Sequence, residues 1–318
     1  ALAAGCTVVV KTSEDAPVAV GLLGTLLQEA GFPPGVVNIV HGIGPEAGVA
    51  LTTHKDVQKI SFTGSTDVGR LIARDAAANF KKVTLELGGK AAQIVFADAD
   101  VEAAAMGVAM GLFVNQGQTC AAGSRIFVQR SLVQAFEQRL ASMADSIQLV
   151  GPDAPPGPPW VQMGSLISER HRQRVQACIQ QAMSEGAQTL TKQVDPGQSS
   201  GFYLRPTVFT NVTPDMTIAR EEVFGPVGVV IPFDTEEEAI ALANDSRYAL
   251  SASLWTRDVS VAHRVAAQLD AGAVAINCWS PLDPRVPWGG GKDSGVGKDL
   301  SRKALESYLE EKVVTLAL

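Results

Sequence analysis

The chain has 318 residues, of which 46% are hydrophobic and 19% are charged, and it carries a formal net charge of −7 with a pI near 5.2. This length and composition are typical of a globular protein with one or two sizeable cores. The acidic balance, without any run of five Lys or Arg residues, argues against a nucleic-acid surface, and no apolar stretch is long enough to span a bilayer. We therefore expect neither a nucleic-acid nor a membrane partner.

The four cysteines and the four histidines are scattered along the chain. The cysteines form no CxxC pair and no histidines have the spacing of zinc ligands, so the sequence predicts no metal site. Isolated cysteines are typical of a reducing, cytoplasmic environment. The apolar opening, residues 1–10, follows no basic segment and is interrupted by Lys11, which is not the pattern of a signal peptide. Since the chain begins without Met inside a predicted element, we expect a fragment, truncated at its N-terminus, or a processed product.

Apolar, β-branched runs alternate with helical periodicity through residues 1–88. Strands are expected at 7–11, 36–40, 57–63 and 83–87, with helices at 16–30, at 45–51 and from the Gly64–Gly69 segment to Ala77. Such alternation predicts βαβ units and a parallel sheet. Lys11, Gly64–Ser65 and Glu86 all come at strand ends, and ligands bind at the carboxyl ends of parallel strands. We expect these residues to line one crevice.

A second α/β unit is expected over residues 89–293. Its strands are predicted at 92–96, 124–128, 227–232, 249–256 and 273–277, and its helices at 101–114, 132–149, 168–185, 236–244 and 259–269. Residues 153–159, rich in Pro and Gly, and the polar residues 194–201 are expected to be loops. Residues 294–308 are expected to return to the first domain. The apolar end, 309–318, is predicted to be an edge strand that a partner chain covers in an oligomer.

Cys120 lies in an unusual stretch, residues 115–125 (NQGQTCAAGSR), which follows an apolar helical run. Its neighbours are small or amide side chains, and none is bulky or charged for several residues on either side. A thiol in that setting can meet a substrate, and its thiolate is a strong nucleophile. From composition alone, a buried structural cysteine in a small-residue turn is an equally good interpretation.

Four motifs occur in order along the chain: Phe62–Thr66 (FTGST), Glu86–Lys90 (ELGGK), Gln116–Cys120 (QGQTC) and Glu221–Pro226 (EEVFGP). Together they resemble the NAD(P)-dependent aldehyde dehydrogenase superfamily, and Cys120 follows Glu86 by 34 residues, as the family pattern has it. The resemblance covers the whole chain. It implies an α/β fold with an incomplete Rossmann-like, parallel-sheet cofactor domain at 1–88, a second α/β domain with the catalytic thiol at 89–293, and a C-terminal oligomerisation strand.

The resemblance implies that Cys120 attacks the aldehyde and that Glu86 is the general base that activates water against the resulting thioester. A thiol adduct is needed because an aldehyde hydrogen on sp² carbon is a poor hydride donor. Burial would raise the pKa of Glu86 toward neutrality, which suits a base. Without the motifs, a carboxylate at a strand end is usually only solvated.

The resemblance also implies NAD as the cofactor, with NADP as the alternative. The helix start at Gly64 and Ser65 would meet the pyrophosphate, although it lacks the GxGxxG fingerprint and is otherwise a capped turn. Lys11 and Glu14 would meet the adenosine ribose, where a carboxylate favours NAD over NADP; otherwise they form a surface ion pair. The remaining cofactor residues that the resemblance implies are Thr66, Gly69, Leu87, Glu222 on the nicotinamide ribose, and Phe224 beside the ring.

Further features follow from the resemblance alone. Trp288 would line the aldehyde tunnel, and Asp299 would relay protons. Relatives carry an upstream Trp-Asn-Phe-Pro segment whose Asn completes the oxyanion hole with the backbone N–H of Cys120, and this chain begins after that segment. Trp279 and Trp288 are a weak indication of an aromatic or cationic aldehyde, because indole faces suit both.

The sequence thus predicts an oxidoreductase that converts a small-molecule aldehyde to a carboxylate with NAD, in a protein that is a homodimer or homotetramer at full length. Two alternatives stay open. One is a cofactor-independent thioesterase or esterase that uses Cys120 and Glu86, and the other is a catalytically silent truncated subunit.

Overall fold

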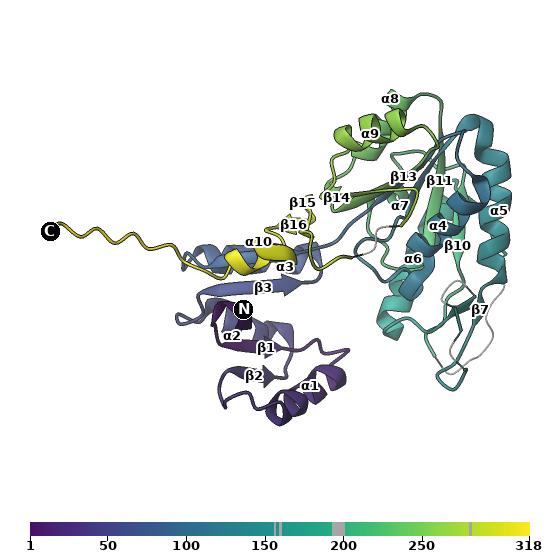
Figure 1. Cartoon of the computed structure of the whole chain (residues 1–318). Coiled ribbons are helices and arrows are strands. Elements are labelled where there is room, and N and C mark those ends of the chain that lie inside the picture. The colour runs from purple at the N-terminus through teal and green to yellow at the C-terminus, as the bar shows by residue number, and fades with distance from the viewer. Residues whose placement is uncertain (156, 159–160, 193–200, 280–281) are drawn as a thin grey trace. The chain divides into compact units, whose positions relative to one another are not determined.

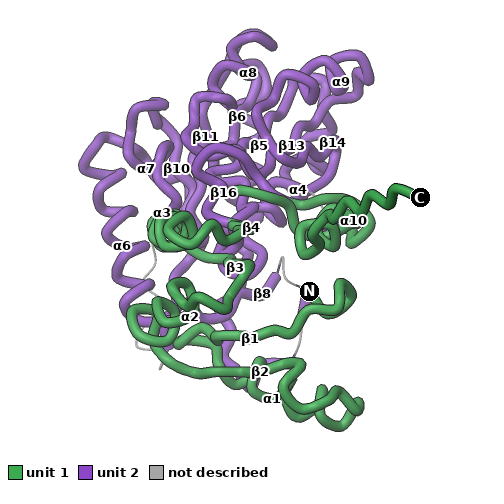
Figure 2. The backbone as a smooth tube through the Cα atoms, turned by 90° about the vertical axis from the view of Figure 1, so that its left-hand side faces the viewer, with its two compact units in different colours: residues 1–86, 283–288, 296–318 green, residues 87–282, 289–295 purple. Residues whose placement is uncertain are grey.

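The computed structural model describes all 318 residues except 156, 159–160, 193–200 and 280–281. The predicted loop 194–201 therefore lies almost entirely outside the described residues, as do parts of the loop 153–159. The chain divides into two compact units, which Figure 2 colours separately. Unit 1 comprises Ala1–Glu86, Asp283–Trp288 and Val296–Leu318, and unit 2 comprises Leu87–Leu282 and Gly289–Gly295.

Unit 1 contains two separate pairs of parallel strands. One pair is β1 (Val8–Lys11) with β2 (Val37–Val40), and the other is β3 (Lys59–Thr63) with β4 (Lys82–Glu86). The short strand β16 (Gly295–Val296) lies beside β4. The four predicted strands are thus present and pair in parallel, and no ladder joins the two pairs within the described residues.

The helices of unit 1 are η1 (Leu2–Ala4), α1 (Val18–Glu29), η2 (Gly44–Gly48), α2 (Val49–Thr53), α3 (Thr66–Ala77) and α10 (Ser301–Glu306). Helix α3 begins at Thr66, shortly after β3 ends at Thr63. The Ser65 hydroxyl caps it by accepting a hydrogen bond from the Val68 N–H at 3.4 Å. Ile72 and Ala76 form its buried face. The cap and this face place Gly64 in a tight strand-to-helix turn.

Unit 2 is built on a seven-stranded sheet in the order β14-β13-β5-β6-β11-β10-β9, which is parallel except for β9 at one edge. Its strands are β5 (Ala92–Val95), β6 (Arg125–Gln129), β9 (Gln188–Thr189), β10 (Thr207–Thr210), β11 (Val227–Phe233), β13 (Ser251–Trp255) and β14 (Ala273–Ile276). The central strands are nearly continuous apolar runs, as strands buried on both faces are. The short strands β9 and β10 are additions to the predicted set.

Helices cover both faces of this sheet (Figure 1). One face carries α4 (Val101–Phe113) and α5 (Val133–Ser146), and the other carries α6 (Glu169–Ser184), α8 (Glu236–Asn244) and α9 (Val259–Gln268). Successive side chains of β6 alternate between the two cores, with Ile126 and Val128 on the α4–α5 side and Phe127 on the other. The shorter elements of unit 2 are η3 (Val114–Gly117), η4 (Arg130–Leu132), β7 (Gln148–Leu149), β8 (Gln162–Met163), α7 (Thr217–Arg220), β12 (Tyr248–Ala249) and β15 (Gly291–Lys292).

Three neighbouring strands of unit 2, β5, β6 and β11, begin just after sequence motifs. The pairing registers align Arg125 with both Ala92 and Val229. The segments that precede the three strands, 88–90, 115–124 and 222–226, therefore come together at the amino-terminal edge of the sheet. In unit 1 the motif residues instead lie at or just after the carboxyl ends of their strands.

Residues 309–318, predicted to be an oligomerisation strand, have no regular secondary structure in this single chain. The side chains of Val313, Val314, Leu316 and Leu318 are largely exposed. A strand needs a partner strand for its backbone hydrogen bonds, so this assignment stays a prediction.

The described part of the chain contains no helix that is both long and apolar enough to cross a membrane.

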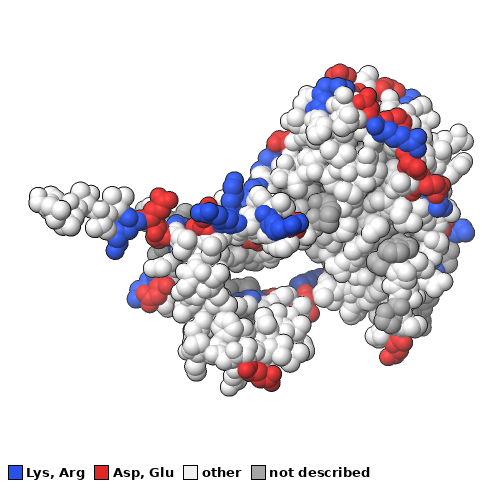
Figure 3. All heavy atoms as spheres, in the orientation of Figure 1, with Lys and Arg blue, Asp and Glu red and all other residues white. Residues whose placement is uncertain are grey.

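On α8 and α9 the acidic and basic side chains are interspersed (Figure 3), as in the ion pair of Arg264 with Glu236 at 2.7 Å.

Candidate active site

Cys120 lies in the loop between α4 and β6, where the backbone takes an uncommon conformation. Asn115 and Gly117 have φ angles of 53° and 68°, in the left-handed region. Non-glycine residues such as Asn115 adopt this region rarely, so hydrogen bonds within the loop and from outside it must hold this conformation. The Asn115 side chain donates to the Gln118 carbonyl at 2.8 Å, and the Ile167 N–H donates to Gln118 Oε1 at 2.9 Å. The loop leaves Cys120 partly exposed.

Two glycines let the cysteine loop pack against neighbouring backbone. A side chain on Gly89 would overlap with the Cys120 carbonyl oxygen, and a side chain on Gly117 would overlap with the Gly225 carbonyl oxygen. Only glycine allows such close approach of two backbones. The cysteine loop is therefore fixed between the segment before β5 and the segment before β11.

Glu222 reaches the same glycine pair. The Gly89 N–H donates to Glu222 Oε1 at 2.9 Å, and a side chain on Gly88 would overlap with the Glu222 carboxylate. Burial raises the pKa of Glu222, and the Gly89 N–H and the Arg174 guanidinium oppose that shift. Ser294, which is fully buried, donates its hydroxyl to the Gly88 carbonyl at 2.7 Å. The Glu222 carboxylate is thus held by the backbone of Gly88 and Gly89, and the Ser294 hydroxyl holds that backbone in turn.

Phe224 has a left-handed φ of 58°, which is unusual for an aromatic residue. His171 on α6 donates from Nε2 to the Phe224 carbonyl at 2.7 Å, and the two rings meet edge to face with centroids 6.0 Å apart. Arg174, one helical turn further, donates to the Glu222 carbonyl at 3.0 Å. The motifs identified Phe224 and Glu222 but not His171 and Arg174, because polar residues on an amphipathic helix carry no signal of what they contact.

A small cavity opens among these segments, and it is lined by residues that include Gly89, Gly117, Thr119, Ala122, Glu222 and Phe224.

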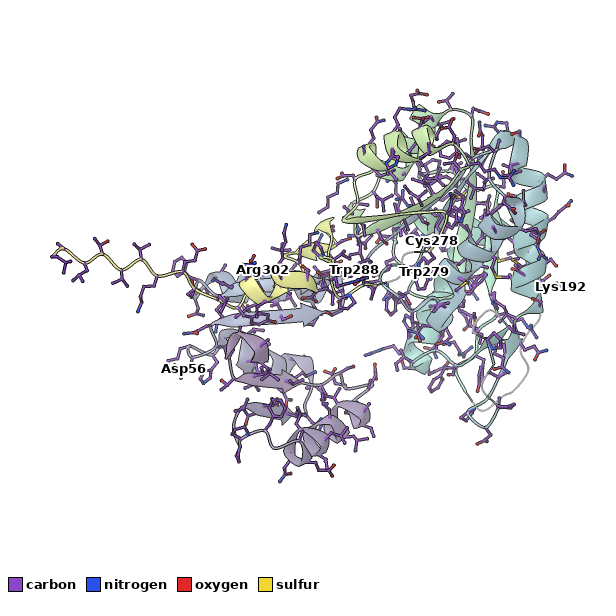
Figure 4. All side chains as sticks on the ribbon, in the orientation of Figure 1. Asp56, Lys192, Cys278, Trp279, Trp288 and Arg302 are labelled. Atoms are coloured by element: carbon purple, nitrogen blue, oxygen red, sulfur yellow. The ribbon has the colours of Figure 1, made fainter. Side chains whose placement is uncertain are left out.

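Trp279, which follows Cys278 (Figure 4), packs on α4 at Gly111, where a Cβ would lie 2.8 Å from the indole ring. The suggested part of Trp279 in aldehyde recognition stays a prediction.

Glu86 ends β4 of unit 1 in a buried position, with 4% of its surface exposed. Neither carboxylate oxygen has a hydrogen-bond partner among the described residues. Burial raises the pKa of Glu86 to about 7, the negative charge of Asp299 adds to the rise, and the Lys298 ammonium opposes it. A carboxyl group that titrates near neutrality can take up and release a proton at physiological pH, as a general base must.

The backbone of Asp299, the second acidic residue near Glu86, is held by hydrogen bonds. It pairs with Trp288 through two N–H···O bonds of 2.8 and 2.7 Å. Burial raises the pKa of Asp299, and the ammonium of Lys59 opposes the rise. Lys59 in turn donates to the Thr84 hydroxyl at 2.7 Å. The negative charge of Asp299 therefore contributes to the raised pKa of Glu86, and its part in a proton relay stays a prediction.

The structure brings Lys11 and Glu14 together as an ion pair of 3.0 Å. The Gly44 N–H also donates to Glu14 Oε1 at 2.6 Å. The Glu14 backbone N–H, the Lys11 side chain and the Gly44 N–H all lower the pKa of Glu14. In the other strand pair of unit 1, the N–H of Gly64, which directly follows β3, donates to the Glu86 carbonyl at 3.1 Å. That bond brings the start of α3 to the end of β4.

The other predicted cofactor residues have local structural partners. Thr66 and Gly69 are buried on α3, and Ser65 caps that helix. Leu87 belongs to unit 2, where it is buried and its N–H donates to the Ser294 carbonyl at 2.9 Å. Their contacts with a cofactor stay predictions.

Fold and site together define an α/β protein with a thiol in a glycine-packed loop and a buried carboxyl group of near-neutral pKa. The model of the aldehyde dehydrogenase family matches residues 1–314, and the chain belongs to that family.

The chain is similar over its whole length to curated relatives and over nearly all of it to solved structures. It is 46% identical to aldehyde dehydrogenase 1A1 of Gallus gallus, covering 100% of this chain and 62% of that protein. It is 44% identical to the putative aldehyde dehydrogenase DhaS of Bacillus subtilis, covering 100% of this chain and 63% of that protein. The NAD+ complex of aldehyde dehydrogenase from Bacillus cereus matches with a TM-score of 0.90 and 43% identity, over 96% of this chain and 61% of that one. This chain thus spans less than two thirds of each relative's length.

We predict that Gly89→Ala destabilises unit 2, because the added methyl group would overlap with the Cys120 carbonyl and disturb the N–H that holds Glu222. The expected cost is about 1–3 kcal/mol of unfolding free energy, as for other overpacked sites. Gly291→Ala is the matched control, since a Cβ there meets no described atom within 4 Å. Denaturant titration of both variants measures the difference. Equal unfolding free energies would contradict the described packing.

Proposed function

We propose that this protein is an NAD-dependent aldehyde dehydrogenase that oxidises a small-molecule aldehyde to the carboxylate. The observation that carries the proposal is the packing of the Cys120 loop against the segment that bears Glu222 and Phe224, through Gly89 and Gly117. This packing supports a nucleophile close to a carboxylate that can hold ribose hydroxyls. The solved relatives from Bacillus cereus and Staphylococcus aureus that are described as NAD+ complexes support the cofactor.

In the first half of the proposed reaction, the Cys120 thiolate adds to the aldehyde carbon, so that a C–S bond forms and the carbonyl oxygen becomes an oxyanion. NAD+ bound beside it would accept the hydride that leaves this carbon, which oxidises the adduct to a thioester. Glu222, fixed by Gly89, holds the nicotinamide ribose, and Phe224 flanks the ring. The chain's own task in this half is to keep these groups aligned.

In the second half, Glu86 removes a proton from water and the water oxygen attacks the thioester carbon. The C–S bond breaks, and the thiolate of Cys120 leaves with its electron pair. Asp299 passes the proton from Glu86 toward solvent. Aldehyde, NAD+ and water thus give carboxylate, NADH and two protons.

Apart from Leu87, which belongs to unit 2, the remaining cofactor contacts are assigned to unit 1. Lys11 and Glu14 hold the adenosine ribose, and 46% of the Glu14 side chain is exposed and so accessible to hydroxyl groups. The negative charge of Glu14 disfavours a 2′-phosphate, which supports NAD over NADP. The pyrophosphate is assigned to the start of α3, at Gly64, Ser65, Thr66 and Gly69. Leu87, directly after β4, is a further residue assigned to the cofactor.

We also infer a cytoplasmic location and a homo-oligomeric protein. The four cysteines are scattered along the chain and form no CxxC pair, which supports a reducing compartment. The exposed apolar residues 313–318 support a strand that pairs with a second copy of the chain.

Cys120→Ser is expected to abolish NADH formation in the complete product of the gene, because a serine hydroxyl is not ionised at neutral pH and forms the adduct poorly. Loss of a nucleophile of this kind lowers turnover by about 10⁴-fold or more. Cys278→Ser, at an exposed cysteine, is the matched control and should keep full activity. Ultraviolet absorbance of NADH with a panel of aldehydes measures both. If the parent protein instead hydrolyses thioesters without any nucleotide and forms no NADH, a cofactor-independent hydrolase replaces this proposal.

Asp299→Asn is expected to lower the pKa of Glu86, because it removes a negative charge that disfavours ionisation of its neighbour. A base works when it is deprotonated, so thioester hydrolysis should rise with pH around a midpoint near 7 in the parent and around a lower midpoint in the variant. The pH dependence of the hydrolysis step, measured under single-turnover conditions, gives both midpoints. Asp283→Asn, whose carboxylate pairs with Arg285 at 2.6 Å, is the control. An upward shift or no shift for Asp299→Asn would contradict the assignment.

A further inference from the structure

The helix α6 contacts the backbone of residues 222–225 from one face. The contacts come from positions i, i+3 and i+4, which lie on the same side of a helix. They are a hydrogen bond from His171 Nε2 to the Phe224 carbonyl at 2.7 Å, another from Arg174 Nη2 to the Glu222 carbonyl at 3.0 Å, and packing of Val175 on Gly225, where a Cβ would lie 2.8 Å from Val175 Cγ1.

Of these residues of α6, His171 contacts both the backbone and the side chain of Phe224. The backbone of Phe224 is left-handed, with a φ of 58°, and a bulky residue keeps that conformation only when neighbours support it. The His171 and Phe224 rings also meet edge to face, with centroids 6.0 Å apart and planes at 68°, an arrangement that aromatic pairs favour. His171 therefore determines both the direction of the chain at Phe224 and the direction of its ring.

His171 is itself well placed to act as a fixed support. Its backbone N–H donates to the Ser168 hydroxyl at 3.2 Å, which is the N-cap of α6. Val175, one turn further, is fully buried in the core of unit 2. Because a carbonyl oxygen only accepts hydrogen bonds, Nε2 of His171 carries the proton.

We propose that His171 is a positioning residue, which holds the Phe224 ring in the orientation that the nicotinamide meets. The inference rests on the proposed function, since it takes Phe224 as the residue beside the cofactor ring. It predicts an effect on cofactor affinity and on hydride transfer, and none on recognition of the aldehyde.

The test compares His171→Leu with His171→Gln in the complete product of the gene. Leucine removes the donor, whereas the glutamine amide nitrogen reaches the position of Nε2 and can donate to the Phe224 carbonyl. Arg170→Leu, at the exposed preceding residue of α6, is the matched control. We expect His171→Leu to lower kcat/KM for NAD+ by about two- to tenfold, as for the loss of one hydrogen bond. The KM for the aldehyde should stay unchanged, and His171→Gln should raise kcat/KM for NAD+ back toward the parent value, because it restores the hydrogen bond although not the ring contact.

A purely structural role for His171 would change the melting temperature and both KM values together, and glutamine would not rescue them selectively. That result would overturn the inference, as would a His171→Leu variant that matches Arg170→Leu. His171→Asn, whose amide is too short to reach Phe224, replaces the leucine variant if the latter does not fold. A parent protein that forms no NADH from any aldehyde would overturn the proposed function first, so the two failures are distinguishable.

Discussion

The hydrogen bond from the Gly89 N–H to Glu222 Oε1, 2.9 Å long, is the contact on which the arrangement in unit 2 depends. Because glycine has no side chain, the Cys120 carbonyl can also pack against Gly89. One residue therefore fixes both the loop of the nucleophile and the carboxylate assigned to the cofactor. The parallel sheet supplies the rest, because β5, β6 and β11 are adjacent and begin close together, which gathers the three loops before them at one edge.

The two important carboxyl groups differ through their surroundings rather than their chemistry. Glu222 accepts a backbone hydrogen bond and has the Arg174 guanidinium nearby, and both favour its ionised form against the effect of burial. Glu86 is buried without a partner among the described residues and lies near the negative charge of Asp299, so its pKa rises to about 7. A carboxylate that binds hydroxyl groups should stay charged, and one that moves protons should titrate. Burial nevertheless raises the pKa of Glu222 as well, so the two groups differ in the Gly89 hydrogen bond that Glu222 accepts and in the negative charge that lies near Glu86.

Much of this could be read from the sequence, and the exceptions have physical causes. The helix at 236–244 has the bounds that the sequence predicts, and in the structure the Thr235 hydroxyl caps it by accepting a hydrogen bond from the Glu238 N–H at 3.2 Å. Lys11, Gly64 and Glu86 do lie at carboxyl ends of strands, but the Cys120 loop lies at the amino-terminal edge of the unit 2 sheet. Strand patterns do not reveal which edge of a sheet a loop occupies. The contact of His171 with Phe224 was equally hidden, because it joins residues 53 positions apart through a backbone carbonyl.

The most direct test of this account is to trap the acyl group on Cys120 in a Glu86→Gln variant of the complete gene product. The account predicts that an aldehyde and NAD+ give one NADH per active site, together with a lasting acyl modification of the peptide that contains Cys120, because hydrolysis lacks its base. Omission of NAD+ should leave that peptide without an acyl group. Peptide mass spectrometry with parallel NADH absorbance measures both products. Formation of NADH without modification of Cys120, or acylation that needs no NAD+, would contradict the central claim.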